Sequence, residues 1–197
     1  IGSRLIACEP EYSIEILASS RKKVVEAPFD DALLEVGSRL LTESDTDSSH
    51  SATLRLIMGR KARLKTHYSA AQELLQKTVT YAQLQNDKET LIRAYYELAL
   101  VSMETREWDS YLLYAHKCFD TALSSQTKEL EGIGYACMGT YKLFNGKYEE
   151  TVELYQSALK CLEEGVERDA IYNNLAVLKG IVGYAHEIPI PECSEPL

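Results

Sequence analysis

The chain has 197 residues, of which 45% are hydrophobic and 26% charged, and its formal net charge is −9. This composition excludes a wholly disordered polymer, the acidic charge argues against binding to nucleic-acid phosphates, and no apolar run approaches the roughly 18 residues of a membrane span. Five cysteines without a C-x-x-C pair are typical of free thiols in a reducing compartment. We therefore expect a cytoplasmic or nuclear protein that binds neither nucleic acid nor a membrane. Because the first residue is Ile1, we also expect a fragment of a longer chain.

The first expected element is a degenerate helical unit at about residues 12–41. Phe29 and Ala32 precede Tyr68 and Ala71, two positions of a clearer unit downstream, by the same interval, which is close to the period of that unit. This spacing indicates a weak copy of a pattern that the chain goes on to repeat.

A polar, acidic loop is expected at residues 42–51. Thr42 and Ser44 each have an aspartate three residues later, a pattern that acid-directed kinases prefer. A solvated linker explains the same composition, and both interpretations stay open.

Three clear units follow, at about residues 52–85, 92–125 and 132–165, with a period of about 40 residues. Four columns keep this spacing: Met58, Leu98 and Met138; Gly59, Ala99 and Gly139; Tyr68, Trp108 and Tyr148; and Thr78, Cys118 and Ala158. Four columns in one register across three copies indicate a tandem repeat.

Each unit is predicted to be two antiparallel helices joined by a turn, because its apolar residues recur with a period of 3.6. No segment alternates as a strand would, so we expect an all-α fold of at least eight helices without a sheet. The small residue at position 59, 99 or 139 lets two helices approach closely, and Gly59 is expected to face Ala71. Asn86 and Glu89 have the spacing of a capping box.

The last expected elements are a terminal helix at about residues 169–187 and a proline-containing extended tail at 188–197. The segment "AIYNNLAVLKGIVGY" is apolar on more than one face. We therefore expect this helix to be covered by a missing repeat, by a partner or by self-association.

The segment "MGTYKLFNGKYEETVELYQSALK" resembles the tetratricopeptide repeat family, with Gly139, Tyr148 and Ala158 at the family's positions. The period of about 40 residues is similar to the longer repeats of kinesin light chains and cell-polarity adaptors. Thr151 in the third unit and Tyr111 in the central unit depart from the pattern, which has alanine there, and the bulky Tyr111 is expected to alter the hairpin packing of the central unit. The resemblance implies a right-handed superhelical array of antiparallel helix pairs, an α-solenoid whose concave groove binds a peptide or helix of another protein.

Residues predicted to line this groove come from the first helix of each unit. They are Arg60, Arg63, Tyr96, Glu97, Leu100, Cys137, Thr140, Asn173, Asn174 and Val177.

Two features of this set suggest how a partner is held. The segment "RLIMGRKARLK" places five basic residues on one helix, which favours an acidic or amphipathic partner, although a solvated basic face is an equal alternative. Asn173 and Asn174 have side chains that can bind a peptide backbone, or can instead bond between helices. The lysine-and-asparagine clamp of chaperone-tail binders is not matched.

No spacing in the chain is typical of a catalytic, cofactor or metal site, and the four histidines are dispersed. The leading hypothesis is therefore a non-enzymatic adaptor or scaffold without a cofactor or a metal. The alternative is an architectural subunit of a stable complex, with the ends of the array buried by neighbouring repeats or subunits. A helical enzyme, or the sensory region of one, is a third and weaker alternative.

Overall fold

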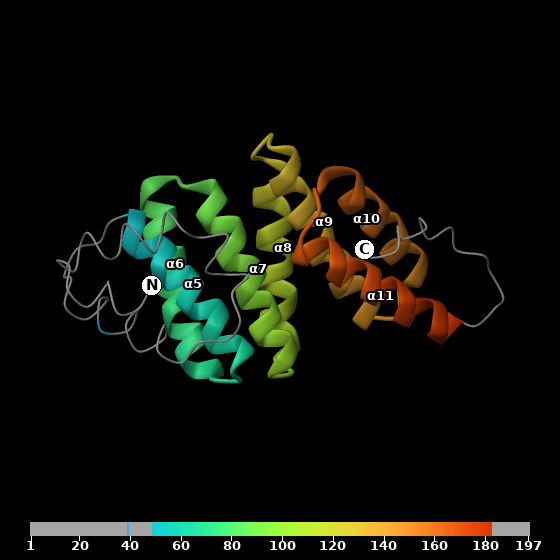
Figure 1. Cartoon of the computed structure of the whole chain (residues 1–197), viewed down its shortest axis with the longest axis horizontal. Helices are drawn as coiled ribbons and strands as arrows, with labels where there is room; N and C mark the ends of the chain where they lie inside the picture. The colour runs from blue at the N-terminus through green and yellow to red at the C-terminus, as the bar shows by residue number, and fades with distance from the viewer. Residues whose placement is uncertain (1–38, 40–48, 183–197) are drawn as a thin grey trace.

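The computed structural model describes residues 39 and 49–182, and this part of the chain contains seven α-helices and no strand (Figure 1). The expected degenerate unit at 12–41 lies outside the described residues except for Arg39, and so do most of the 42–51 loop and the whole 188–197 tail. The all-α prediction is confirmed for the described part.

The seven helices occur in sequence with short connections between them. Their bounds are α5 Ser49–Leu64, α6 Tyr68–Gln85, α7 Lys88–Glu104, α8 Trp108–Leu123, α9 Lys128–Phe144, α10 Tyr148–Cys161 and α11 Val166–Val182. The first helices of the units thus begin at residues 49, 88, 128 and 166, earlier than the expected starts near 52, 92, 132 and 169.

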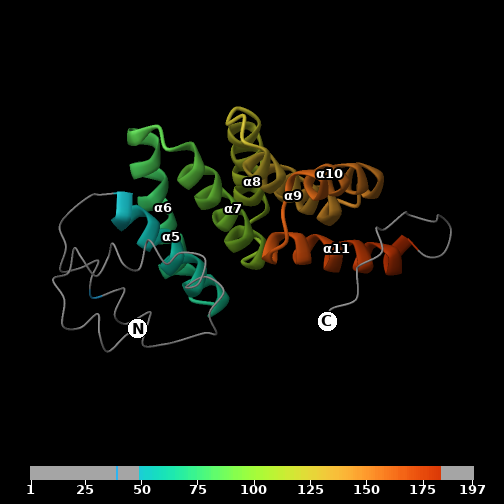
Figure 2. The same cartoon turned by 45° about the horizontal axis from the view of Figure 1, so that its top comes forward.

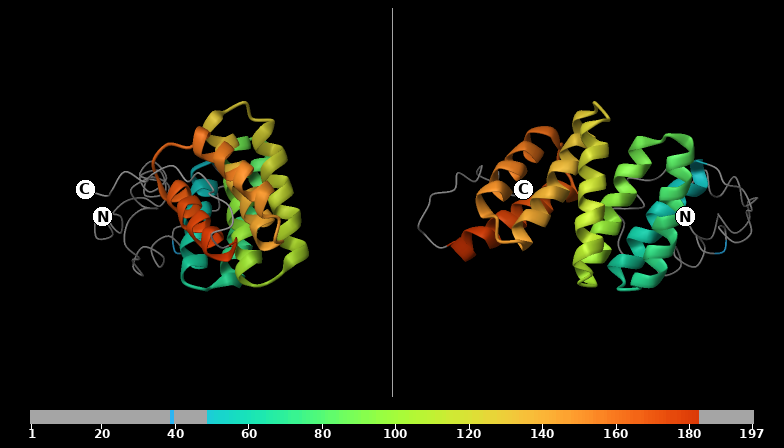
Figure 3. Two further views of the ribbon diagram at one scale, coloured as in Figure 1. Left: turned by 90° about the vertical axis from the view of Figure 1, so that its right-hand side faces the viewer. Right: turned by 180° about the vertical axis from the view of Figure 1, so that it is seen from behind.

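The helices pack as sequential antiparallel pairs, α5 with α6, α7 with α8, and α9 with α10 (Figure 1). Each pair also packs on the next through α6 with α7 and α8 with α9. The first helices contact one another as well, α5 with α7 and α7 with α9, whereas no comparable contact joins the second helices α6, α8 and α10. The contacts between first helices make their layer the continuous one. Figure 3 shows the array end-on and from behind.

Two glycines mark the closest approach within the outer pairs. A Cβ on Gly139 would lie 2.7 Å from the ring of Tyr155, and a Cβ on Gly59 would lie 2.7 Å from Cγ of Leu75. Gly59 therefore crosses over Leu75, and the expected neighbour Ala71 lies farther away, with its backbone oxygen 3.5 Å from the same Cβ position. A side chain at either glycine would occupy the space of its partner, which explains the small residue.

The central pair packs with a different distribution of bulk. Ala99 and Ala115, which correspond in the repeat to Gly59 and Leu75, are both fully buried. Tyr111 stands where the other pairs have Ala71 and Thr151, and it is 1% exposed. Its ring meets the ring of Tyr141 on α9 edge to face, with 5.6 Å between centroids. The bulky residue is therefore accommodated by packing against the next pair.

The repeat is also visible in the backbone of the turns. Thr66, Arg106 and Gly146 occupy equivalent positions in the three units, have φ angles of 61°, 63° and 70°, and end the first helix of each pair. Asn86 and Gln126 have φ angles of 55° and 58° between pairs. A left-handed residue after a helix satisfies its last carbonyl groups and turns the chain.

The expected capping box at Asn86 is wrong by one residue. Asn86 ends α6, and Asp87 is the N-cap of α7, with its carboxylate accepting a hydrogen bond from the backbone N–H of Thr90 at 3.1 Å. The left-handed conformation of Asn86 takes it out of the cap position, so the acceptor role passes to the next side chain.

The last helix departs from the packing of the earlier first helices. α11 contacts α9 and α10 and runs alongside them in Figure 2. Ile171, Leu175 and Leu178 are buried on this side, whereas Val177 and Ile181 are 57% and 55% exposed. The start of α11 reaches across the layer of first helices, because Glu167 pairs with Arg60 of α5.

Candidate protein-binding pocket

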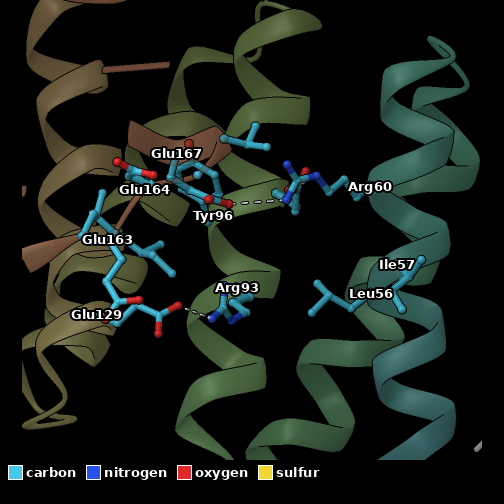
Figure 4. Close-up of a pocket in the computed structure, with 14 residues that line it drawn as sticks. Leu56, Ile57, Arg60, Arg93, Tyr96, Glu129, Glu163, Glu164 and Glu167 are labelled. Carbon is cyan, nitrogen blue, oxygen red and sulfur yellow. Dashed lines mark hydrogen bonds and ion pairs between the residues drawn. The ribbon is translucent and has the colours of Figure 1, made fainter. Parts of the chain in front are cut away.

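A pocket of about 420 Å³ lies on the layer of first helices, between α5, α7, α9 and the connection from α10 to α11 (Figure 4). Its apolar lining comes from Leu56, Ile57, Ile133, Leu162 and Val166. Four of these side chains are nearly fully buried, whereas Val166 is 46% exposed. The pocket therefore has a buried apolar wall and one accessible apolar edge at the start of α11.

The two arginines predicted to bind a partner are held by carboxylates of the protein itself. Arg63 Nε donates to Glu97 at 2.9 Å and Arg63 Nη1 donates to Glu104 at 2.6 Å. Arg60 lies 3.6 Å from the other oxygen of Glu97 and 3.4 Å from Glu167. Glu97 is therefore shared between two guanidinium groups, and its side chain is only 4% exposed.

The pKa of Arg63 shows how far this group is removed from water. Burial alone would lower the pKa of the guanidinium, but the charges and hydrogen bonds of Glu97 and Glu104 outweigh it and raise the pKa. The side chains of Arg60 and Arg63 are 18% and 10% exposed, so both arginines are half-buried in ion pairs and do not form an open, solvated basic face. Reversing the charge of Arg63 would leave Glu97 buried beside a like charge and would disturb the fold.

A second ion pair borders the pocket. Arg93 Nη2 donates to Glu129 at 2.9 Å, and Arg93 Nε donates to Glu89 at 3.2 Å, one turn away on the same helix. The side chain of Glu129 is 59% exposed. Figure 4 shows Arg93 and Glu129 joined to each other at one side of the pocket.

The connection from α10 to α11 is fixed by one arginine. Arg168 Nη1 donates to the backbone oxygens of Leu159 and Leu162 at 2.8 and 2.9 Å, and its guanidinium lies over the ring of Tyr172. These bonds satisfy carbonyl groups at the end of α10. Arg168 therefore holds the segment that carries Glu163 and Glu164 at the mouth of the pocket.

Tyr96 lies between the two ion-paired regions, near Arg60 and Glu167 in Figure 4. Burial raises the pKa of its phenol well above the ordinary value of 10, and the charges of Glu97 and Glu167 raise it further. The phenol therefore stays neutral across the physiological range, as a side chain with an apolar ring and a hydrogen-bonding tip.

The remaining predicted groove residues have different surroundings. Cys137 is buried against Cys118 and offers a partner no surface. Thr140 and Asn174 both bond to the hydroxyl of Tyr155, at 3.0 and 2.8 Å. This is the inter-helix alternative for Asn174, since it joins α11 to α10.

Asn173, Leu100 and Val177 lie outside the lining of the pocket. Asn173 and Val177 are accessible on α11, and Leu100 is half-buried on α7. Of the ten predicted residues, the structure thus brings Arg60, Tyr96 and Glu97 together in the pocket, with Arg63 beside them.

Several lining residues were missed in the sequence. The repeat could have identified Leu56 and Ile57, because they precede the predicted groove residues Tyr96 and Glu97 by one full period. For Glu163, Glu164 and Glu167 there was no such signal, because the connection they flank does not follow the period.

In comparisons with known proteins, no family model matches the sequence, and no similarity to a curated protein is detected. None of the helices in residues 49–182 is both long enough and apolar enough to cross a membrane.

Proposed function

We propose that this chain is a non-enzymatic interaction module, an array resembling tetratricopeptide repeats that binds a segment of another protein across α5, α7 and α9. The observation that supports it most directly is the pocket of about 420 Å³ on the continuous layer of first helices. This volume lies within the roughly 300–1,000 Å³ that ligand pockets occupy. An extended or helical segment laid over this layer would insert one side chain into the pocket and contact the first helices on either side.

The pattern of contacts between helices supports this choice of face. First helices contact one another more closely than second helices do, which supports a layer of first helices on the inside of any curvature. Stacked helix pairs with this arrangement form a groove along the inner layer. We propose, as part of the same function, that the stacked helix pairs curve into a superhelical solenoid.

The test is a selection that presupposes no partner. Random 12-residue peptides displayed on phage are selected on the whole chain, and the winning sequences are measured as synthetic peptides by titration calorimetry. Val166→Trp fills the mouth of the pocket from an exposed position, and Leu84→Trp places the same ring on α6, where Leu84 is 76% exposed. We expect Val166→Trp to weaken binding at least about tenfold and Leu84→Trp to leave it unchanged. Equal binding to both variants would place the partner on another surface.

A second candidate function is supported by the exposed surface of α11. Val177 and Ile181 lie one turn apart and are each more than half exposed, and a Cβ on Gly180 would meet nothing within 4 Å. An apolar stripe of this kind on a terminal helix favours an architectural subunit whose end is covered in an assembly.

Sedimentation equilibrium separates the two candidates. If α11 covers a second copy, the chain sediments as an oligomer, and Val177→Lys with Ile181→Lys makes it monomeric. A chain that stays monomeric at high concentration, with peptide binding intact in the double variant, would speak against self-assembly through α11.

A further inference from the structure

We propose that the segment bound in the pocket is basic and that a lysine or arginine side chain of the partner enters the pocket, an inference that rests on the proposed function. The charge of this partner is opposite to the acidic charge that the basic run on α5 predicted. The reasons are the charge of the lining, the commitment of its arginines and the shape of the apolar wall.

The lining of the pocket has an excess of negative charge. It contains five glutamates and two arginines, which gives a formal charge of −3. The adjacent pair of Arg63 and Glu104 adds one charge of each sign and leaves this balance unchanged. An acidic side chain entering the pocket would meet net repulsion, whereas a cation would be attracted.

The positive charges of the lining are already used. Arg60 is paired with Glu97 and Glu167, and Arg93 is paired with Glu129. If Arg93 turned to an acidic ligand, Glu129 would lose this partner. If Arg60 turned, Glu167 would lose its partner and the buried Glu97 would keep only Arg63.

The negative charges at the mouth remain available. Glu163 and Glu164 are exposed, and neither forms an ion pair within the part of the chain that the structure describes. Arg168 fixes the backbone before and after them through the end of α10 and Tyr172, so they stand at a defined position. Figure 4 shows both carboxylates on the same side of the pocket as Glu129 and Glu167.

The apolar wall suits the stem of a basic side chain. Lysine and arginine carry a flexible apolar stem below the charged group and place that stem on apolar surfaces. Ile57, Ile133 and Val166 line the same pocket as the carboxylates, so an apolar stem and a charged group can both find complementary surface there. A smaller inorganic cation would leave this apolar surface unused.

The test uses the peptides selected on the whole chain. We expect winning sequences to carry a lysine or arginine at one fixed position beside apolar residues. Replacing this residue by glutamine in the synthetic peptide should weaken binding at least about tenfold, and so should Glu163→Lys with Glu164→Lys in the protein. The milder pair Glu163→Gln and Glu164→Gln should weaken binding less. Because both side chains are exposed, the variants keep their thermal stability.

The matched control changes the same charge on α10. Glu149 and Glu153 are exposed glutamates that do not line the pocket, and Glu149→Lys with Glu153→Lys should leave the affinity within about twofold. Glu150 is avoided because it pairs with Lys142 at 2.6 Å.

The outcomes separate this inference from the function on which it rests. Two outcomes would overturn the cationic assignment and leave the pocket as the binding site. In the first, peptides that no longer bind Val166→Trp contain no basic residue. In the second, such peptides bind normally after the charges of Glu163 and Glu164 are reversed. Peptides that bind Val166→Trp as well as the unchanged protein, or a selection without any binder, would overturn both.

Discussion

The third helix pair and the central pair reach the same close packing with opposite distributions of volume. In the third pair Gly139 leaves room for the whole ring of Tyr155, whereas in the central pair Ala99 and Ala115 are both small and the bulk is carried by Tyr111, one turn earlier on α8. All of these residues are buried. A repeat thus preserves the space to be filled at a helix crossing, while the side chain that fills it can change position.

The two buried tyrosines also differ in how their hydroxyl groups are satisfied. The hydroxyl of Tyr155 bonds to Thr140 and Asn174, at 3.0 and 2.8 Å, and so links three helices. The hydroxyl of Tyr111 is buried without a hydrogen-bond partner among the described residues. One tyrosine therefore contributes a polar network to its pair, while the other contributes only its ring.

The largest expected effect comes from filling the space over Tyr155. Gly139→Leu should lower the free energy of unfolding by about 3 kcal/mol, because even its Cβ would lie 2.7 Å from a buried ring held by two hydrogen bonds. Urea denaturation of the whole chain measures this. Gly180→Ala is the control, since its Cβ meets nothing within 4 Å, and it should stabilise α11 by less than about 1 kcal/mol. An unchanged midpoint for Gly139→Leu would show that the crossing is not tight.

A smaller effect is expected from ionising the buried tyrosines. Burial raises the pKa of Tyr155 to about 12, against an ordinary value of 10, although the bonds from Thr140 and Asn174 lower it in part. The neutral phenol is thus favoured in the folded state, so its contribution is complete below pH 10 and is lost as the pH rises through about 12. Two pKa units correspond to about 2 to 3 kcal/mol.

Measuring the free energy of unfolding as the pH is raised into the alkaline range checks this loss of stability. The pKa of Tyr111 is also raised by burial, so each tyrosine should add to the loss of stability above pH 10. Tyr155→Phe and Tyr111→Phe should each make the alkaline slope shallower. A slope that neither substitution changes would mean that other groups drive alkaline unfolding.

At neutral pH the same two substitutions should have unequal effects. Tyr155→Phe removes a hydroxyl with two partners and should cost about 1 kcal/mol. Tyr111→Phe removes a buried hydroxyl that has no partner in the described part of the chain, so it should leave stability unchanged or raise it slightly. Thermal melts of the two variants side by side provide the measurement. Equal losses would contradict the difference in hydrogen bonding between the two pairs.

Much of this architecture could be predicted because its signals are local and periodic. The columns through Gly59 and Gly139 identified both helix crossings, since a small residue at fixed spacing has few other uses in a helix. The partners of Arg60 and Arg63 could not be predicted in the same way. Glu97 and Glu104 lie on another helix, and only the packing of α5 against α7 turns a run of basic residues into a buried ion-pair network.

The acidic mouth of the pocket could not be predicted from the sequence for a different reason. Glu163 and Glu164 belong to a connection without periodicity, and their position depends on the bonds of Arg168 to the end of α10. Glu167 meets Arg60 across 107 residues of chain. Such contacts follow from the position of α11, which no spacing in the sequence indicates.

The smallest expected effect concerns the turns that end the first helices, where the first and third pairs differ by one residue. Thr66 and Gly146 occupy equivalent positions with φ angles of 61° and 70°. A β-branched residue is strained in this conformation, whereas glycine adopts it readily. Thr66→Gly should therefore raise the free energy of unfolding by about 0.5 kcal/mol, because relief of strain is partly offset by the entropy of glycine in the unfolded chain.

The reverse change, Gly146→Thr, should lower the free energy of unfolding by about 1 kcal/mol, and it isolates the backbone term because a Cβ at Gly146 meets nothing within 4 Å. Denaturation of the two single variants and of the double variant, under one set of conditions, gives the comparison. The two turns lie in different pairs, so their effects should add. If Thr66→Gly destabilises the chain as much as Gly146→Thr does, the threonine makes a contribution at its turn that outweighs its strained backbone, and the two turns are not equivalent.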